Sequence, residues 1–464
     1  MQKKKSNSSQ HSKTEKVDIS PAPRFPIVGF GASAGGLEAF SALLSQLKPN
    51  LGMAYVLIMH LSPNHKSALP EILQAKTKMP VHSVKDGMKL QTNHLYVIPP
   101  NTFMSVVDGH LRLAPRSMTS LGNFAIDYFM TTLAEIYQNK SIGVILSGTA
   151  SDGTLGLKAI KSYGGITFAQ DMSAKFSGMP RNAIESGFVD YVFPPEKIAK
   201  ELERIVKTYA ALPLEKIEEV QVGTAEQEAL KKILQLVKVR WATDFDLHYK
   251  RASIYRRVVR RMALNKCNNL RDYLKVISKN EKEIDALYDD FLINVTNFFR
   301  DADFFRTLND RALPSLTKGR AHNDPIRVWV AGCSTGEEVF SVAICILEYL
   351  ERKKLSFAVQ IFGSDLDGQA LAKARTGIYS LSSLADVNTK RLNTYFKKID
   401  GSYQVSRQLR EICIFSQHNL LSDPPFSRID IVSCQNVLIY MEPKPQRRIL
   451  QSFHFALKPI GFLF

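Results

Sequence analysis

The chain has 464 residues, of which 45% are hydrophobic and 23% are charged, and its formal net charge is +17. This composition excludes a mostly disordered chain, and the length is enough for about two to four domains. No stretch approaches the roughly 20 apolar residues needed to cross a bilayer, and the basic start leads into no apolar signal segment. The five cysteines form no C-x-x-C pair, which is typical of a reducing, cytosolic setting without disulfides or a metal cluster.

The first part of the chain alternates between strand and helix patterns. Residues 1–24 are polar and basic and predict a disordered tail. Beyond them, apolar runs bounded by glycine or proline predict buried strands, and runs with a period near 3.6 predict helices. Strands that alternate with helices indicate a parallel sheet covered on both faces, here an α/β domain over 25–210. The strands are expected at 25–33, 54–62, 94–100 and 141–149, and helices at 37–47, 156–164 and 195–210.

The second part begins after a short polar linker at 211–224. Residues 225–310 have a helical pattern without a strand signal, which predicts an all-α domain. Strand patterns then return and predict a second α/β domain over 311–464. These strands are expected at 326–332, 358–365, 413–419, 429–436 and 461–464, so that the chain ends inside the last one and leaves the sheet incomplete at that edge.

The first glycine turn, GFGASAGG from Gly29, fits two motifs. Read as G-x-G-x-x-[GA], it is a dinucleotide fingerprint, which requires an acidic residue at the end of the next strand. That strand ends in His60 and contains no acid. Read as G-x-S-x-G, it presents Ser33 as a nucleophile, and the sequence supplies His60 as a base and Asp152 as an orienting acid at other strand ends. The third interpretation is that the glycines only permit a tight turn.

Residues 25–208 resemble the CheB-type chemotaxis protein-glutamate methylesterases. The resemblance lies in IVGFGASAGGLEAF, VLIMHLSP, GVILSGTASDGTLGLKAIKSYGG and FAQDMSAKFSGMPRNAI. It implies hydrolysis of glutamyl methyl esters on chemoreceptors, and in many members deamidation of glutamine. The family's catalytic triad then falls on Ser33, His60 and Asp152.

A basic segment follows in the helical region. Arg256, Arg257, Arg260 and Arg261 recur at helical spacing on one side, opposite Ile254, Val258 and Met262. A solvated face, a nucleic-acid site and a surface for an acidic protein helix are all compatible with this pattern, although no base-reading motif accompanies it. The segment resembles the helical domain of CheR-type chemoreceptor methyltransferases, which implies that these arginines face the carboxylate-bearing methylation helices of chemoreceptors.

The second glycine turn, AGCSTGEE, follows a predicted strand and carries Gly332 and Gly336. Such a turn also suits dinucleotides or plain packing. Asp365, at the end of the next strand, can accept hydrogen bonds from ribose hydroxyls, and no basic phosphate cradle accompanies the turn. A nucleoside without phosphates therefore fits better, and S-adenosylmethionine is the common one.

Residues 225–464 resemble the CheR-type protein-glutamate O-methyltransferases through LINVTNFFR, AGCSTGEE, GSDLD, QHNLL and CQNVLIYM. The resemblance implies a Rossmann-like fold that uses S-adenosyl-L-methionine, with a small β insertion at 377–412. Arg300 and Tyr440 would lie nearest the transferred methyl group. The implied cofactor contacts are Asn294, Thr296, Arg300, Glu337, Asp365, Asn419, Leu420, Gln435 and Asn436.

Together these features predict a cytoplasmic chemotaxis enzyme that fuses a methylesterase to a methyltransferase and needs no metal. The alternative is a non-catalytic sensory scaffold in which the methyltransferase half only binds cofactor or receptor.

Overall fold

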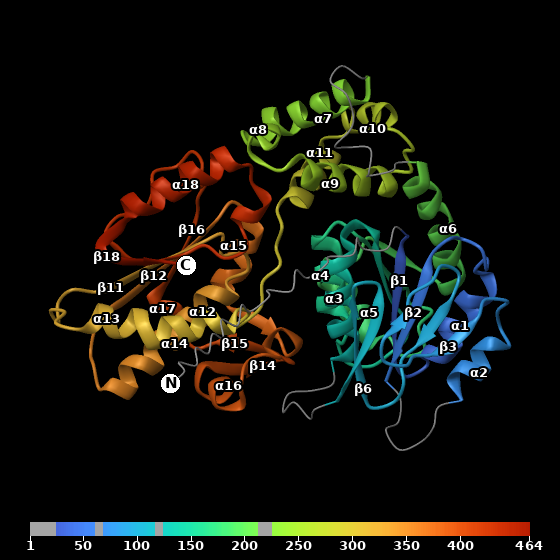
Figure 1. Ribbon diagram of the computed structural model, residues 1–464, viewed down its shortest axis with the longest axis horizontal. Coiled ribbons are helices and arrows are strands. Elements are labelled where there is room, and N and C mark those ends of the chain that lie inside the picture. Colours follow the sequence, from blue (N-terminus) through green and yellow to red (C-terminus); the bar gives the residue numbers. More distant parts are fainter. Residues whose placement is uncertain (1–24, 61–67, 117–123, 212–224) are drawn as a thin grey trace, which may run out of the picture.

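The computed structural model describes residues 25–60, 68–116, 124–211 and 225–464. Two sheets with their helices lie beside each other, and a group of helices lies across the gap between them (Figure 1). Over these described ranges, no helix is both long and apolar enough to cross a membrane. The expected tail at 1–24 and nearly all of the expected linker lie outside the described residues.

The first sheet has seven parallel strands in the order β10-β9-β8-β1-β2-β5-β3. The chain adds β2 on one side of β1 and later β8 on the other, so the direction of winding reverses at β1. Open α/β sheets bind ligands at such a reversal, beyond the carboxyl ends of the strands. The strands are β1 (Ile27–Ala32), β2 (Ala54–Met59), β3 (Val81–Ser83), β5 (Leu95–Val97), β8 (Ser141–Ile145), β9 (Ile166–Gln170) and β10 (Tyr191–Phe193).

Both faces of this sheet are buried, which explains its uninterrupted apolar strands. In β2, Tyr55 and Leu57 join the core beneath one layer of helices, whereas Val56 and Ile58 join the core beneath the other. Helices α1 (Gly36–Gln46) and α6 (Pro195–Ala211) cover the first face, and α3 (Ala125–Tyr137) and α4 (Thr154–Ser162) cover the second. The two remaining helices are α2 (Leu69–Gln74) and α5 (Gly178–Glu185).

A small antiparallel sheet beside α3 was not expected from the sequence. Its order is β4-β7-β6, with β4 (Met88–Lys89), β6 (Thr102–Val107) and β7 (His110–Pro115). The expected strands at the four apolar runs are confirmed as β1, β2, β5 and β8, whereas β3, β9 and β10 were also missed. The missed strands β3, β9 and β10 have only three to five residues each, too few to show a clear hydrophobic period.

The helical region is confirmed as all-α. Its helices pack around one apolar core that includes Ile233, Val258, Tyr273 and Leu287. They are α7 (Ala225–Trp241), α8 (Phe245–His248), α9 (Arg251–Leu264), α10 (Leu270–Ile277) and α11 (Glu281–Phe291).

The arginines of α9 do not form the exposed basic face that the sequence predicted. Arg260 is fully buried, and its guanidinium pairs with Asp190 of the first α/β unit and Asp290 of α11. Its Nε donates to the Gly165 carbonyl oxygen at 2.9 Å. Arg257 is also buried, and burial lowers its pKa to about 10. Helical spacing placed these arginines on one side correctly, but that side packs against Asp190 of the first α/β unit and carboxylates of α11 instead of facing solvent.

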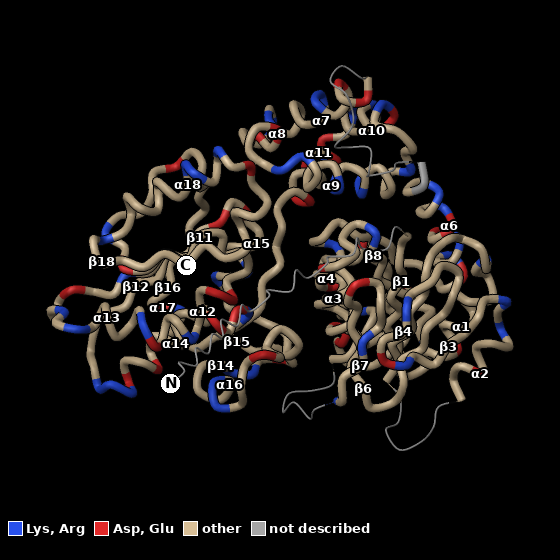
Figure 2. The backbone as a smooth tube through the Cα atoms, in the orientation of Figure 1, with Lys and Arg blue, Asp and Glu red and all other residues tan. Residues whose placement is uncertain are grey.

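The neighbouring arginines are half-buried. Arg261 pairs with Glu283 of α11, and burial is the leading cause that lowers the pKa of Arg256. Figure 2 shows that Lys and Arg are spread over all three parts of the molecule, so the net charge of +17 is not concentrated on α9.

The second sheet has five strands, all parallel, in the order β16-β12-β11-β17-β18. Its winding reverses at β11, as the first sheet's does at β1. The strands are β11 (Ile326–Ala331), β12 (Val359–Asp365), β16 (Cys413–Gln417), β17 (Ile429–Ser433) and β18 (Leu457–Leu463). The helices are α12 (Ala302–Thr307), α13 (Leu313–Thr317), α14 (Glu337–Lys353), α15 (Gly368–Thr376), α16 (Thr389–Tyr395), α17 (Arg407–Ile412) and α18 (Pro443–Ala456).

The residues that follow α11 belong to the second sheet's core. Phe298, Phe304 and Phe305 pack in one cluster with Val328 of β11 and Phe340 of α14. The packing partners therefore change near residue 292, and the boundary expected at 310/311 falls inside a helical run.

The small β insertion is a three-stranded antiparallel sheet, β13-β15-β14. Its strands are β13 (Ile378–Ser380), β14 (Phe396–Ile399) and β15 (Ser402–Val405). The two residues between β14 and β15, Asp400 and Gly401, have φ of 40° and 80°. Positive φ at both positions is the requirement of a type I′ hairpin turn, which explains the Asp-Gly pair.

Candidate active sites

The turn after β1 holds Ser33 at the point where the first sheet reverses. The Ser33 N–H donates to the Ser147 carbonyl oxygen at 3.0 Å, and the Ser147 hydroxyl donates to the Ala34 carbonyl oxygen at 2.8 Å. Gly35 has a φ of 70° and begins α1. A Cβ on Gly148 would lie 3.0 Å from the Cβ of Ser33 and 2.1 Å from the Met179 sulfur, so a side chain there would crowd both Met179 and the serine turn.

His60 and Asp152 follow the strands on either side of β1 and meet beyond its end. His60 Nε2 lies 2.8 Å from Asp152 Oδ2, and Asp152 is only 3% exposed. When Nε2 carries the proton that it donates to the carboxylate, Nδ1 is the nitrogen left to accept one. Among the described residues, the Ser33 hydroxyl has no hydrogen bond to His60. The structure therefore brings the base and the acid together and holds the serine at the neighbouring strand end.

The carboxylate of Asp152 is fixed by the first turn of α3. Oδ2 accepts from the Ile126 N–H at 3.0 Å, and Oδ1 accepts from the Asp127 N–H at 2.9 Å. Asp127 in return accepts from the Gly156 N–H at 2.7 Å, in the first turn of α4. Sequence analysis missed Asp127, because a single acid in an apolar helix carries no signal of its partners.

Burial, followed by the charge of Asp152, raises the pKa of Asp127 well above its usual range. Both effects favour the protonated form of Asp127. His60 contacts the other carboxyl group, that of Asp152.

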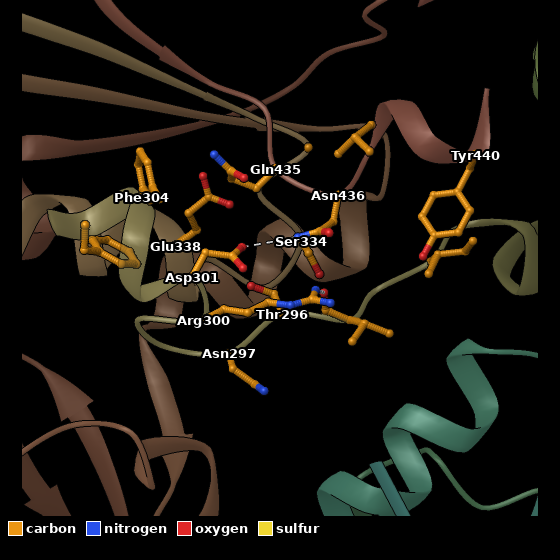
Figure 3. A pocket seen from close by; sticks show the side chains of 15 residues that line it. Thr296, Asn297, Arg300, Asp301, Phe304, Ser334, Glu338, Gln435, Asn436 and Tyr440 are labelled. Carbon is orange, nitrogen blue, oxygen red and sulfur yellow. Dashed lines mark hydrogen bonds between the residues drawn. The ribbon is translucent and has the colours of Figure 1, made fainter. Parts of the chain in front are cut away.

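A second site lies at the carboxyl ends of β11, β12, β16 and β17. Two adjoining cavities share Ile293, Gly332, Asn436, Val437 and Tyr440. Figure 3 shows the first of them. Eight of the nine residues expected to contact the cofactor line one or both cavities. They are Asn294, Thr296, Arg300, Asp365, Asn419, Leu420, Gln435 and Asn436.

The loop between β11 and α14 shapes this second site. Gly332 has a φ of 72°, and a Cβ on it would lie 2.3 Å from a methyl group of Val437. The Ser334 N–H donates to Asp365 Oδ2 at 2.7 Å, and the Ser334 hydroxyl donates to Asn294 Oδ1 at 2.8 Å. Asp365 also accepts from the Asp367 N–H at 2.9 Å, and burial raises its pKa.

Arg300, between α11 and α12, and Tyr440, between β17 and α18, both line the first cavity (Figure 3). Arg300 Nη1 donates to the Val295 carbonyl oxygen at 2.9 Å, which anchors its guanidinium within its own loop. Burial raises the pKa of Tyr440, and the positive charges of Arg257 and Arg300 oppose that rise. The two residues expected nearest the transferred methyl group therefore do lie at one site.

Glu337 is the exception among the expected cofactor residues, because it lines neither cavity. It is 2% exposed and accepts from the Thr335 hydroxyl, and Lys158 of the first α/β unit lies 3.8 Å away. The next residue, Glu338, lines the first cavity instead and accepts from the Ser433 hydroxyl at 2.6 Å. Burial raises the pKa of Glu338 to about 7. A Glu-Glu pair at a helix start gives no sequence signal of which side chain turns inward.

Three protein-family models match successive parts of this chain. Residues 28–202 match the CheB methylesterase model, 228–292 the all-α domain of CheR methyltransferase, and 294–464 the SAM-binding domain of CheR methyltransferase.

Several curated proteins are similar to parts or most of the chain. A 104.1 kDa uncharacterized protein of Rhodobacter capsulatus is 35% identical over 415 residues, which are 85% of this chain and 43% of that protein. The chain thus spans less than half the length of this relative. The chemotaxis protein methyltransferase of Salmonella typhimurium is 34% identical over 50% of this chain and 81% of its own. A Leptospira interrogans protein named for protein-glutamate methylesterase and protein-glutamine glutaminase is 33% identical over 38% of this chain and 92% of its own.

Among solved structures, the catalytic domain of the CheB methylesterase of Thermotoga maritima is 29% identical and covers 39% of this chain and 98% of its own, with a TM-score of 0.37. A glycopeptide N-methyltransferase solved with S-adenosyl-L-methionine is 15% identical over 33% of this chain and 53% of its own, with a TM-score of 0.19. The three family models match in succession, and a methyltransferase and a methylesterase are each more than 30% identical over more than two thirds of their own length: the chain belongs to the CheB methylesterases and the CheR methyltransferases, as a fusion of the two.

Proposed function

We propose that the chain both removes and adds methyl groups on chemoreceptor glutamates, with Ser33, His60 and Asp152 as the hydrolytic triad. The observation that carries the first half is the 2.8 Å contact between His60 and the buried Asp152, next to the turn that holds Ser33. An imidazole oriented by a carboxylate is what a serine hydroxyl needs to become a nucleophile.

The hydrolysis follows from these positions. The Ser33 oxygen attacks the ester carbonyl carbon while His60 Nδ1 takes the hydroxyl proton, and Asp152 stabilises the imidazolium through Nε2. The C–O bond to the methoxy group then breaks, and His60 returns the proton to release methanol. Water, activated by the same imidazole, hydrolyses the acyl-serine to a free glutamate. With glutamine as substrate, the same steps release ammonia.

For the second half, the lining of the two cavities supports a site for S-adenosyl-L-methionine, which supplies an electrophilic methyl group when bound. Asp365 would accept the ribose hydroxyls, since each of its oxygens has a free lone pair beyond the backbone bond it already accepts. The other contacts would come from Asn294, Thr296, Arg300, Asn419, Leu420, Gln435 and Asn436.

Arg300 would orient the receptor carboxylate for attack on the methyl group, with Tyr440 on the opposite wall. A guanidinium presents paired N–H donors that match a carboxylate, so its contribution is mainly to position the substrate. The receptor's methylation helices are the proposed partner. We propose residues 25–210 as the methylesterase domain. For the methyltransferase, the packing supports a boundary near residue 292, which gives an all-α domain at 225–292 and a cofactor-binding domain at 293–464.

Each half has its own test. The unchanged chain should release methanol from a premethylated receptor fragment, and the Ser33→Ala variant should release none. Calorimetry should detect S-adenosylmethionine binding to the full chain, weakened by one or more decades in Asp365→Ala, because charge-assisted hydrogen bonds contribute about 1.5–3 kcal/mol each. A chain that binds cofactor and receptor but catalyses neither reaction would support the scaffold alternative instead.

A further inference from the structure

Helix α4 of the methylesterase domain reaches the methyltransferase domain. It begins directly after Asp152 and Gly153, and Lys158 lies in its middle with only 5% of its surface exposed. The Lys158 ammonium lies 3.8 Å from Glu337 Oε1 and 3.4 Å from the Thr335 hydroxyl. A lysine of one domain is therefore buried against the glycine loop of the other.

Glu337 needs this lysine. The carboxylate is 2% exposed, and a buried negative charge without a counter-ion is costly. The Thr335 hydroxyl donates to both Glu337 oxygens, at 2.9 and 2.6 Å, but brings no charge. Within the described ranges, Lys158 is the one cation within ion-pair distance of Glu337.

The groups that Lys158 holds are next to those that line the cofactor cavities. Thr335 and Glu337 flank Gly336, whose φ of 92° ends the glycine loop and starts α14. Ser334, one residue before Thr335, lines the first cavity and donates to both Asp365 and Asn294. A shift of Thr335 would therefore move the two hydrogen bonds that orient Asp365 and Asn294.

We propose that Lys158 of the methylesterase domain is a positioning residue of the methyltransferase site. By pairing with Glu337 and Thr335, it fixes the glycine loop in the conformation from which Ser334 orients Asp365. The proposal rests on the proposed function of those residues in binding S-adenosylmethionine. No described hydrogen bond or ion pair joins Lys158 to Ser33, His60 or Asp152, so we expect its loss to act mainly on the methyltransferase site.

One consequence is reciprocal. If docking of the methylesterase domain favours cofactor binding through Lys158, cofactor binding must favour docking by the same factor. The two opposing activities would then share one arrangement of domains, held by this buried pair.

The test uses the full chain and three substitutions. Lys158→Met keeps the length of the side chain and removes its charge, and Lys158→Arg keeps the charge. Lys161→Met is the matched control, because Lys161 lies on the same helix, donates to the Gly187 carbonyl oxygen and pairs with Asp190, and none of its described contacts is to the glycine loop of the methyltransferase domain. S-adenosylmethionine affinity is measured by calorimetry, and methanol release reports the methylesterase.

We expect Lys158→Met to weaken cofactor binding about tenfold or more, within the usual range of coupling between sites, and to leave methanol release within about twofold. Lys158→Arg should restore most of the affinity, and Lys161→Met should not change it. Glu337→Gln should weaken binding as well, and the double variant Lys158→Met/Glu337→Gln should lose less than the sum of the two single losses, because the groups act as a pair.

Equal cofactor affinity in the unchanged chain and Lys158→Met would overturn the proposal, as would additive losses in the double variant. Loss of methanol release would reveal that Lys158→Met does not fold. In that case the Glu337→Gln and double variants decide the question, because the double variant leaves no unpaired charge. Failure of the unchanged chain to bind the cofactor would contradict the proposed function itself, which keeps the two failures distinct.

Discussion

Replacing Asp152 by asparagine should nearly abolish ester hydrolysis while leaving the protein folded. The carboxylate accepts three hydrogen bonds: Oδ2 accepts from His60 Nε2 and the Ile126 N–H, and Oδ1 accepts from the Asp127 N–H. An amide has the same shape but only one acceptor oxygen, so it cannot satisfy both positions.

Either orientation of the amide is unfavourable. With its oxygen toward His60, its NH2 faces the Asp127 N–H, and two buried donors oppose each other at a cost of about 1–3 kcal/mol. With its NH2 toward His60, it donates to Nε2 and leaves the proton on Nδ1, the nitrogen that must accept from Ser33. Either orientation leaves one backbone N–H, that of Asp127 or that of Ile126, facing the NH2 group, and the second orientation also prevents catalysis. We expect kcat to fall about 10³- to 10⁴-fold, as loss of the correct tautomer does in serine hydrolases.

Methanol release from premethylated receptor fragment measures this loss, with Ser33→Ala as the baseline. Asp127→Asn is the matched control, because Asp127 is also a buried aspartate in the same hydrogen-bond network. Burial and the charge of Asp152 favour the protonated form of Asp127, so an amide should replace it with less than about a tenfold loss. Comparable activity of Asp152→Asn and the unchanged chain would refute the role of the His60–Asp152 pair.

Three further predictions concern other buried charges. Because the native pKa of Asp127 is raised, the native state keeps a proton that the unfolded state releases, so stability should fall as pH rises above about 4. Urea titrations should show a flatter pH dependence in Asp127→Asn, and an identical slope would contradict this. Glu338, with a pKa of about 7, should lose its proton between about pH 6 and 8 and strengthen binding of the cationic S-adenosylmethionine. Calorimetry across this range should show that gain in the unchanged chain but not in Glu338→Gln. Arg260→Met should destabilise the protein by about 3–5 kcal/mol, because it leaves the buried side chains of Asp190 and Asp290 with only the more distant cations Lys161, at 3.9 Å, and Arg261, at 4.0 Å. Unfolding by urea measures this loss, and a neutral effect would argue that the junction is not held by these ion pairs.

The sequence was sufficient to predict where the site residues lie along the chain. Ser33, His60, Asp152 and Asp365 each follow an apolar run that forms a parallel strand, and the carboxyl ends of such strands meet at one edge. Each of these positions depends on local pattern and on a rule of sheet topology, whereas the catalytic and binding roles of the residues stay predictions.

Contacts between domains could not be predicted in this way. Arg260 lies on the polar side of an amphipathic helix, and periodicity cannot distinguish solvent from an acidic neighbour such as Asp190, 70 residues away in sequence. Likewise, nothing near Glu337 in the sequence indicates that its partner is Lys158. In α9, the adjacent residues Val258 and Val259 are both buried, so more than one side of the helix is covered. The errors therefore occur where a side chain's environment comes from a distant part of the chain.

The most direct test of the central claim follows one methyl group through both sites. The full chain is incubated with an unmethylated receptor fragment and S-adenosylmethionine labelled in its methyl group, and label is measured on the receptor and in released methanol. At a cofactor concentration near the dissociation constant of the unchanged chain, we predict label in both for the unchanged chain, label on the receptor alone for Ser33→Ala, and strongly reduced label in both for Asp365→Ala. Absence of label from the receptor and from methanol with the unchanged chain, in a preparation that binds the receptor, would contradict the account.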